Sequence, residues 1–367
     1  MAEAMTPKER WLAALRMEPV DRLPFWPKLT AAYPPAQAEP FRSMAIPDIH
    51  RWIGSDRHEG VGLGLRTIYT RCRMETKTDA GRSETVYHTP SGTMRHVMTF
   101  DDASQAWHPV VFPITSREQI EMMTEFYADA RAEINPAGLE QARLRAKETG
   151  QDALVAGNIG TSGLMVWVEH LAGIENAHLL MADHPAEVEA LFAAMDALLY
   201  RKAELAAAHT PCDALYLTEN TSTTLTSPAQ FRRYELPVMR RCGEITRAAG
   251  RPLILHMCGH LKALLPDLGA LPVAAFEAFT APTLGNTTLL DGRTACPDKC
   301  LIGGTNAMLW LKPADRIIEQ IDRDIRALPH LRGIVVTSAG VMPPLCKPET
   351  IKRVCEWVRG RTARAEN

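Results

Sequence analysis

The 367-residue sequence lacks the features that mark several specialised classes of protein. No apolar run approaches the roughly 18 residues that a membrane-spanning helix needs, so we expect no membrane association. No block of Lys and Arg stands out in a chain whose net charge is −2, which argues against nucleic acid as a partner. Eight cysteines are too sparse for a disulfide scaffold in a chain of this length. We therefore expect reduced cysteines and a cytoplasmic protein.

A glycine-rich turn of the G-x-G-x-x-G type does not follow any strand-like segment, which disfavours a dinucleotide-binding doubly wound sheet. Six short, nearly continuous apolar runs are present instead, and helix-length segments separate them. This pattern is typical of parallel strands buried on both faces, so it predicts a (β/α)8 barrel. The expected strands are 153–157, 214–218, 253–258, 273–277, 301–304 and 333–338, and the clearest helical patterns cover 186–208, 228–249 and 313–327.

The first part of the chain has a different pattern. Thr6 can cap a helix that runs to about Arg16, because Pro7 and Glu9 follow it at capping-box spacing. A short strand is expected at 23–26, and three β-rich runs between residues 62 and 100 predict an antiparallel meander. We interpret 1–367 as one domain, with the N-terminal helix, first strand and meander in about 1–115 and the main barrel in 116–367.

Polar side chains collect where the predicted strands end, which in this fold is the edge that carries the chemistry. Each asparagine among them also has a simpler interpretation, as a residue that caps a strand end. The group as a whole nevertheless predicts a functional mouth. Its members are Asn158, Glu219, Asn220, His256, Cys258, Glu277 and Asn306.

The run from His256 to His260 contains the most specific pattern. Alternation along a strand places His256 and Cys258 on the same, inward face. Imidazole and thiolate together suit Zn²⁺, although a neutral hydrogen-bonded pair fits the same spacing. A catalytic zinc needs a third ligand, for which Cys346 is the best sulfur candidate and Glu219 the best oxygen candidate.

Three segments resemble the uroporphyrinogen decarboxylase superfamily, which implies a (β/α)8 barrel independently. They are Glu9–Trp26, Thr226–Pro237 and Pro348–Val354. Decarboxylases of this superfamily carry an Arg-Gln-Ala-Gly-Arg stretch after the first strand, whereas this chain has Pro27–Ala32 with Lys28 as the sole cation. That departure argues against true decarboxylase activity, because a porphyrinogen with many carboxylates needs several fixed cations. The segment Thr89–Met94 and the His-Met-Cys-Gly-His run are similar to the corrinoid-dependent methyltransferase branch.

This resemblance implies transfer of a methyl group between a corrinoid (a cobalamin-type cofactor on a partner corrinoid protein) and tetrahydrofolate or a thiol. The thiol-methylating members bind zinc through His-x-Cys and a later cysteine, whose position is Ala339 here. Either Cys346 substitutes from the following loop, or the site is built differently. For a folate we expect Glu219, His260 and Glu277 in catalysis, the last two as candidates to handle the proton. The expected binding residues are Lys28, Asn158, Glu219, Asn220 and Asn306.

Two other functions stay open at this point. One is decarboxylation of a small, non-porphyrin substrate on the same barrel. The other is a corrinoid-binding or metal-binding protein without catalysis, which is less favoured because the sequence lacks the Asp-x-His-x-x-Gly motif of cobalamin-binding modules. The identity of the small-molecule methyl donor or acceptor and the presence of a homodimer also stay open.

Overall fold

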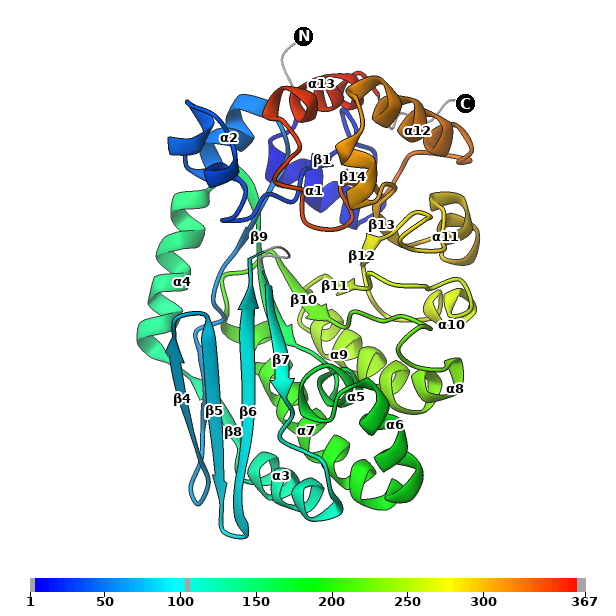
Figure 1. The fold of residues 1–367 in the computed structure, drawn as a ribbon. Helices are drawn as coiled ribbons and strands as arrows, with labels where there is room; N and C mark the ends of the chain where they lie inside the picture. Colours follow the sequence, from blue (N-terminus) through cyan, green and yellow to red (C-terminus); the bar gives the residue numbers. More distant parts are fainter. Residues whose placement is uncertain (1–3, 103–105, 362–367) are drawn as a thin grey trace.

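A parallel eight-stranded sheet forms the centre of the computed structural model, which describes residues 4–102 and 106–361. Its strand order is β1-β14-β13-β12-β11-β10-β9-β2, and the two end strands meet where the backbone N–H of Asp56 donates to the carbonyl of Phe25 at 2.7 Å. The sheet therefore closes into the predicted (β/α)8 barrel (Figure 1). Its strands are β1 (Phe25–Trp26), β2 (Arg57–Gly60), β9 (Ala153–Gly160), β10 (Ala214–Thr218), β11 (Leu253–His256), β12 (Ala275–Phe279), β13 (Cys300–Gly303) and β14 (Ile334–Thr337).

Helices cover the outside of the barrel, and the three predicted helical patterns are confirmed. The α-helices are α1 (Pro7–Leu15), α2 (Ile46–Ile53), α3 (Arg117–Asp129), α4 (Pro136–Thr149), α5 (Gly163–Val166), α6 (Ile174–Asp183), α7 (Pro185–His209), α8 (Pro228–Gln230), α9 (Leu236–Ala248), α10 (Leu265–Leu268), α11 (Leu289–Ala295), α12 (Ala314–Arg326) and α13 (Pro348–Arg359). Short 3-10 turns are η1 (Pro34–Ala36), η2 (Phe41–Ser43) and η5 (Ala307–Leu311), and π-helical turns are η3 (Trp167–Leu171) and η4 (Phe231–Glu235). None of the helices in the described ranges is long and apolar enough to cross a membrane.

The predicted strand 253–258 is too long, because β11 stops at His256. The sequence does not predict strand β2, since Arg-His-Glu-Gly has no apolar run. Its side chains alternate between the barrel interior and the helical layer, so a polar strand is still a barrel strand here.

The meander is confirmed in part. Four antiparallel strands form a separate sheet: β4 (Arg73–Asp79), β5 (Arg82–Thr89), β6 (Gly92–Asp101) and β7 (Ala106–Val111). The first predicted run divides in two, because β3 (Leu65–Ile68) leaves the meander and pairs with β8 (Arg131–Ile134). The four-stranded sheet projects beside α3 (Figure 1), where Tyr87 and Phe126 stack edge to face with ring centroids 5.1 Å apart.

The segment that carries the N-terminal resemblance forms a buried charge network under the barrel. Thr6 and Glu9 make the predicted capping box, which starts α1 and points Arg10 inward. Asp56 is fully buried and accepts hydrogen bonds from Arg10, from Arg22 at 2.7 Å and from the Phe25 backbone at 3.0 Å. This arrangement ties α1, β1 and β2 together at the amino-terminal edge of the strands.

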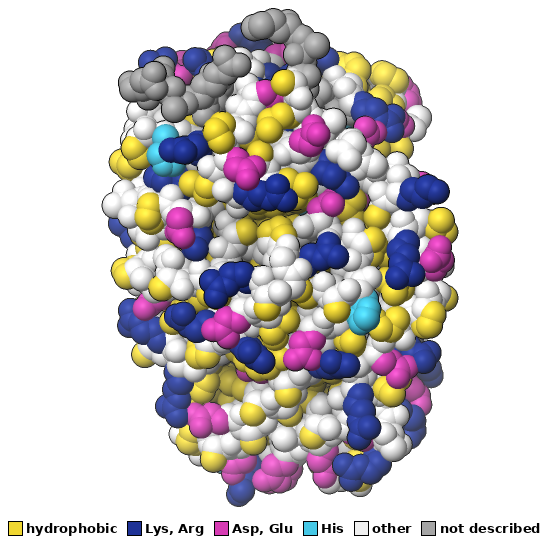
Figure 2. Space-filling view, turned by 180° about the vertical axis from the view of Figure 1, so that it is seen from behind, with side chains coloured by type: hydrophobic (Ala, Val, Ile, Leu, Met, Phe, Trp, Pro, Cys, Tyr) yellow, Lys and Arg dark blue, Asp and Glu magenta, His cyan; other side chains and the backbone are white. Residues whose placement is uncertain are grey.

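The outer surface opposite the view of Figure 1 has no field of a single charge. Lys and Arg side chains are interspersed with Asp and Glu over this face (Figure 2).

Candidate active site at the carboxyl ends of the strands

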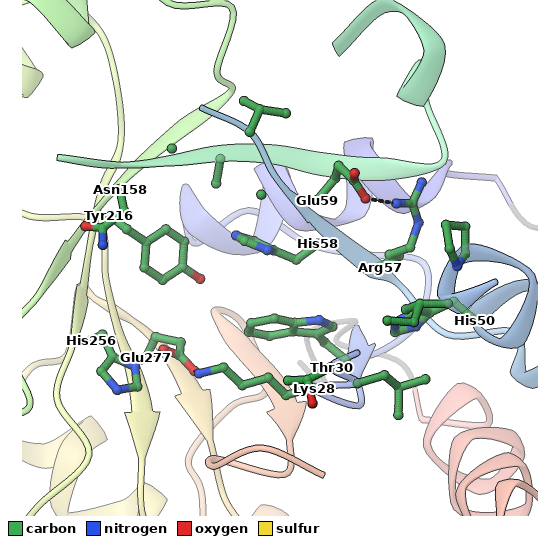
Figure 3. Close-up of a pocket in the computed structure, with 18 of the residues that line it drawn as sticks. Lys28, Thr30, His50, Arg57, His58, Glu59, Asn158, Tyr216, His256 and Glu277 are labelled. Carbon is green, nitrogen blue, oxygen red and sulfur yellow. Dashed lines mark hydrogen bonds and ion pairs between the residues drawn. The ribbon is translucent and has the colours of Figure 1, made fainter. Parts of the chain in front are cut away.

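A cavity of about 790 Å³ opens inside the barrel and runs outward between β1 and β2. Such a volume lies in the range that holds a drug-sized ligand. Four residues predicted for the site line it: Lys28, Asn158, His256 and Glu277. Figure 3 shows His256, Glu277 and Asn158 at one end of the cavity, with Arg57 and Glu59 at the other.

The polar end is organised around Glu277, which is almost fully buried on β12. One carboxylate oxygen accepts a hydrogen bond from Lys28 Nζ at 2.9 Å, and the other contacts Nδ1 of His256. The Cys258 side chain also favours the charged form of the His256 ring and so helps to raise its pKa. The parallel register places His256 directly opposite Glu277 on the neighbouring strand, so the sheet itself fixes this contact.

This arrangement fixes the protonation of both groups. Burial alone would raise the pKa of Glu277, but Lys28 and His256 outweigh it and lower the pKa to about 2. Burial likewise opposes the charge of His256, yet the hydrogen bonds to Cys258 and Glu277 raise its pKa to about 9. At neutral pH the site therefore holds an imidazolium beside a carboxylate that stays ionised.

Three aromatic side chains form the middle of the cavity. His58 lies 4.9 Å from the Trp26 ring and 5.1 Å from the Tyr216 ring, measured between centroids. Burial lowers the pKa of His58 to about 4, so its ring is neutral. His58 Nε2 and the Tyr216 hydroxyl are buried and have no hydrogen-bond partner in the described part of the chain. Buried polar atoms are normally paired, so these two are the atoms we expect a ligand to engage.

The outer end of the cavity carries two guanidinium groups that share one carboxylate. Glu59 accepts from Arg145 Nε at 2.8 Å and also pairs with Arg57. His50 lies beside them, and burial lowers its pKa to about 3, so it adds no charge.

Glu219 and Asn220 end β10 as predicted but do not line the cavity. Glu219 is fully buried behind the barrel wall, where its carboxylate accepts from the backbone N–H of Ser162 at 3.0 Å and from the Ser162 hydroxyl. Burial, with the neighbouring Glu235, raises the pKa of Glu219 well above its usual range. Asn220 donates to Glu169 at 3.0 Å and accepts from the Cys258 thiol at 3.6 Å.

The second histidine of the motif, His260, lies outside the cavity lining and its backbone joins two loops. Its N–H donates to the Ser222 hydroxyl at 3.0 Å, and its carbonyl accepts from the Thr223 N–H at 3.1 Å. A Cβ atom on Gly259 would come within 2.2 Å of the Ser222 Cβ atom, so only glycine fits between these loops. The Gly259-His260 half of the motif therefore packs the loop after β11 against the loop after β10.

Asn306 and Cys346 also lie apart from the cavity. Asn306 caps η5 by accepting from the Leu309 N–H at 3.0 Å and donates to the carbonyl of Pro282 at 2.8 Å. Cys346 is buried, its carbonyl accepts from the Tyr33 hydroxyl at 2.6 Å, and burial raises the pKa of its thiol to about 12.

The predicted zinc site does not assemble from these side chains. Within residues 4–102 and 106–361, no group of three or more His, Cys, Asp and Glu side chains is placed to hold a metal ion. His256 and Cys258 are close together, but the structure does not bring Cys346 or Glu219 to them as a third ligand. The donor set thus falls short of the three protein ligands that a catalytic zinc uses.

Several lining residues are not predicted from the sequence, chiefly Trp26, Arg57, His58, Arg145 and Tyr216. The signal for Tyr216 is present, since Ala214, Tyr216 and Thr218 form the inward set of a strand that is predicted correctly. No such signal exists for His58 and Arg57, because β2 itself has no strand-like pattern.

The fold defines a (β/α)8-barrel protein with a cavity at the carboxyl ends of its strands, the edge that carries the active site in this fold. The family model described as uroporphyrinogen decarboxylase (URO-D) matches residues 98–361, and the chain belongs to this family. No curated protein matches it by sequence.

Two solved structures match this chain, and the first of them shares its fold. A methyltransferase from Methanosarcina mazei has a TM-score of 0.59 at 16% identity, over 97% of this chain and 98% of that one. A protein described as a putative vitamin-B12-independent methionine synthase from Listeria monocytogenes has a TM-score of 0.39 at 13% identity, over 60% of this chain and 68% of that one.

Proposed function

We propose that this protein is a methyltransferase that moves a methyl group between a corrinoid, carried by a partner protein, and tetrahydrofolate bound in the cavity. The observation that carries the proposal is the contact of Glu277 with Lys28 and His256, which keeps the imidazole of His256 protonated at the inner end of the cavity. The same cavity contains two buried polar atoms that have no hydrogen-bond partner among the described residues. The methyltransferase from Methanosarcina mazei, which shares the fold over nearly the whole chain, supports the same class.

The charges of the lining argue against the porphyrinogen decarboxylation for which the family is named. Lys28 is paired with Glu277, and Arg57 and Arg145 share the single carboxylate of Glu59, so these side chains leave only one positive charge in excess. A porphyrinogen with many carboxylates needs several cations that are available to bind it. Decarboxylation of a smaller substrate is the alternative outcome, which release of carbon dioxide would reveal.

Between the two acceptors that the resemblance implies, the donor set favours the folate. A thiol acceptor is activated by zinc in related enzymes, and His256 and Cys258 have no third ligand within the described residues. Breaking the bond between a methyl group and N5 of a folate instead requires a proton on that nitrogen. His256 can supply it, because Glu277 keeps the ring protonated at neutral pH and Lys28 keeps Glu277 in place.

The remaining groups of the cavity suit a pterin. Asn158 at the end of β9 and Thr218 at the end of β10 offer amide and hydroxyl groups to its edge. The Tyr216 hydroxyl and His58 Nε2 add two unpaired polar atoms within an aromatic wall. The cobalt of the corrinoid supplies the chemistry of methyl exchange, while this chain binds the folate, orients N5 and handles its proton.

The carboxyl-end loops support a protein partner for the corrinoid. Five apolar side chains on the loops after β12, β13 and β14 are exposed to solvent: Leu284, Met308, Leu311, Val341 and Leu345. Exposed apolar groups gathered at one edge commonly mark a docking surface.

The test mixes purified protein with reduced free cobalamin and 5-methyltetrahydrofolate and follows the absorbance of methylcobalamin. We expect methylcobalamin to form, and His256→Gln to lower the rate about 100-fold because the proton donor is lost. The control is His260→Gln, whose ring lies outside the cavity and whose backbone contacts the substitution preserves; it should retain the rate. Absence of any spectral change with both folate and thiol donors would refute the methyltransferase class.

A further inference from the structure

The cavity changes its chemistry along its length. Its inner end carries Lys28, Glu277 and His256, its middle is aromatic, and its outer end carries Arg57 and Arg145 around Glu59. Figure 3 shows His58 between the inner group and the outer group. A ligand that fills this space needs a hydrogen-bonding head, a flat middle and an anionic end.

The outer end exists because β1 and β2, although joined at the amino-terminal edge of the barrel, are not paired neighbours in the sheet. Strand β1 has two residues, and its backbone is joined to the β2 side by the bond from Asp56 N–H to Phe25 O at the amino-terminal edge. Alternation along β2 turns His58 into the barrel and Arg57 and Glu59 toward α2 and α4. We call this opening between β1 and β2, lined by Pro47, Arg57, Glu59 and Arg145, the seam.

The charge of the seam favours an anion. Among the residues that line it, two guanidinium groups face a single carboxylate, since both Arg57 and Arg145 pair with Glu59. Arg145 also lies 3.6 Å from Glu148, but that carboxylate is well exposed on the outer surface, where water screens it. The Arg145 side chain is itself 50% exposed and comes from the neighbouring helix α4, so it can turn toward a ligand without unpacking the barrel.

We propose that the seam is the tail subsite of the folate, where Arg145 and Arg57 bind a carboxylate of its glutamate moiety. This assignment rests on the proposed function, and it adds that the head lies against His256 and the aminobenzoyl ring against Trp26, His58 and Tyr216. Arg145 would be a specificity residue and would take no part in the chemistry. It would contribute to affinity for donors that carry the tail and to nothing else.

The experiment compares two methyl donors, 5-methyltetrahydrofolate and 5-methyltetrahydropteroate, which has the same head and ring but no glutamate. Arg145→Ala should raise the KM for the folate about tenfold and leave kcat and the KM for the pteroate unchanged, because one charge-assisted contact to the tail is lost. The matched control is Arg143→Ala, which removes an exposed guanidinium from the same helix outside the cavity. Equal effects of Arg145→Ala on both donors, or no effect on either, would overturn the subsite.

A second variant tests the sign of the effect. Glu59→Gln removes the carboxylate that competes for both guanidinium groups, so folate should bind several-fold more tightly at low salt while pteroate does not. A merely structural role for the cluster would weaken both ligands alike, which would contradict the proposal. Calorimetric measurement of the binding of both compounds distinguishes failure of the subsite from failure of the proposed function. Binding that depends on the tail, without formation of methylcobalamin, would refute methyl transfer alone. Methyl transfer that does not depend on the tail would refute the tail subsite alone.

Discussion

Two similar charge networks lie at opposite edges of the barrel and have different roles. At the amino-terminal edge, Asp56 is held by Arg10 and Arg22, all three buried. At the carboxyl-terminal edge, Glu277 is held by Lys28 and His256, both of which border the cavity. In each network two cations contact one carboxylate. Asp56 directly precedes β2, and Glu277 lies within β12.

The difference lies in the cations. Guanidinium groups stay charged at any pH a protein meets, so the Asp56 network has one state and serves to join α1, β1 and β2. The charge of an imidazole is adjustable, so the Glu277 network has a proton to give. The same electrostatic arrangement therefore has a structural role at one edge, where it joins α1, β1 and β2, and a chemical role at the other, where it holds a proton.

The largest expected effect is the loss of stability when the Asp56 network is disrupted. Asp56→Asn removes the buried carboxylate that Arg10 and Arg22 share, although Arg10 keeps its ion pair with Asp21 at 2.7 Å. We expect the free energy of unfolding to fall by about 3 kcal/mol. Urea denaturation followed by circular dichroism measures this loss. Glu277→Gln is the comparison variant and should cost less, because Lys28 and His256 can meet water in the cavity. An Asp56→Asn protein as stable as the wild type would show that the network does not join α1, β1 and β2.

The next largest effect is a pH dependence of stability, which we expect from the Glu277 network but not from the Asp56 network. The pKa of His256 is raised from 6.5 to about 9 in the folded chain. Its stabilisation is therefore complete below about pH 6.5 and is lost as pH rises through about 9, with an upper limit of about 3 kcal/mol. Urea denaturation at several pH values should show this loss in the wild type and in Arg143→Ala, and His256→Gln should remove it. A slope in this pH window that persists in His256→Gln would assign it to other groups.

The smallest expected effect concerns the thiol beside the imidazole. Cys258→Ala removes one hydrogen bond that supports the charge of His256 but leaves Glu277 in place, so methyl transfer from the folate should fall by less than about tenfold. The rate of methylcobalamin formation measures it, with Cys346→Ala as the control for a cysteine away from the cavity. Complete loss of activity, together with one zinc per chain by elemental analysis, would reinstate the zinc site.

Most of the fold is predictable from the sequence, because short apolar runs separated by helix-length segments are typical of few architectures. The six later barrel strands are predicted by their burial on both faces. Strand β2 escapes prediction for the opposite reason: it borders the seam, and Arg57, His58 and Glu59 serve a cavity instead of a core. Strand β2, whose sequence least resembles a barrel strand, is thus part of the site.

The site is predictable only to the extent that a strand end fixes direction. His256 and Glu277 lie within strands, so alternation places them correctly in the mouth. Glu219 and Asn220 lie just past the end of β10, where Asn220 takes a positive φ of 49° and the chain turns. Sequence spacing identifies the edge for such residues but not the face, and Glu219 faces Ser162 behind the wall.

The two-residue length of β1 bears on the kinetics of the proposed reaction. A closed wall would give the cavity one entrance, so a corrinoid protein covering the mouth would trap or exclude the second substrate and impose an order of binding. With the wall open beside β1, the folate has its own way in and out. Initial-rate patterns for such a barrel should be those of a random-order ternary complex, with either substrate free to leave first.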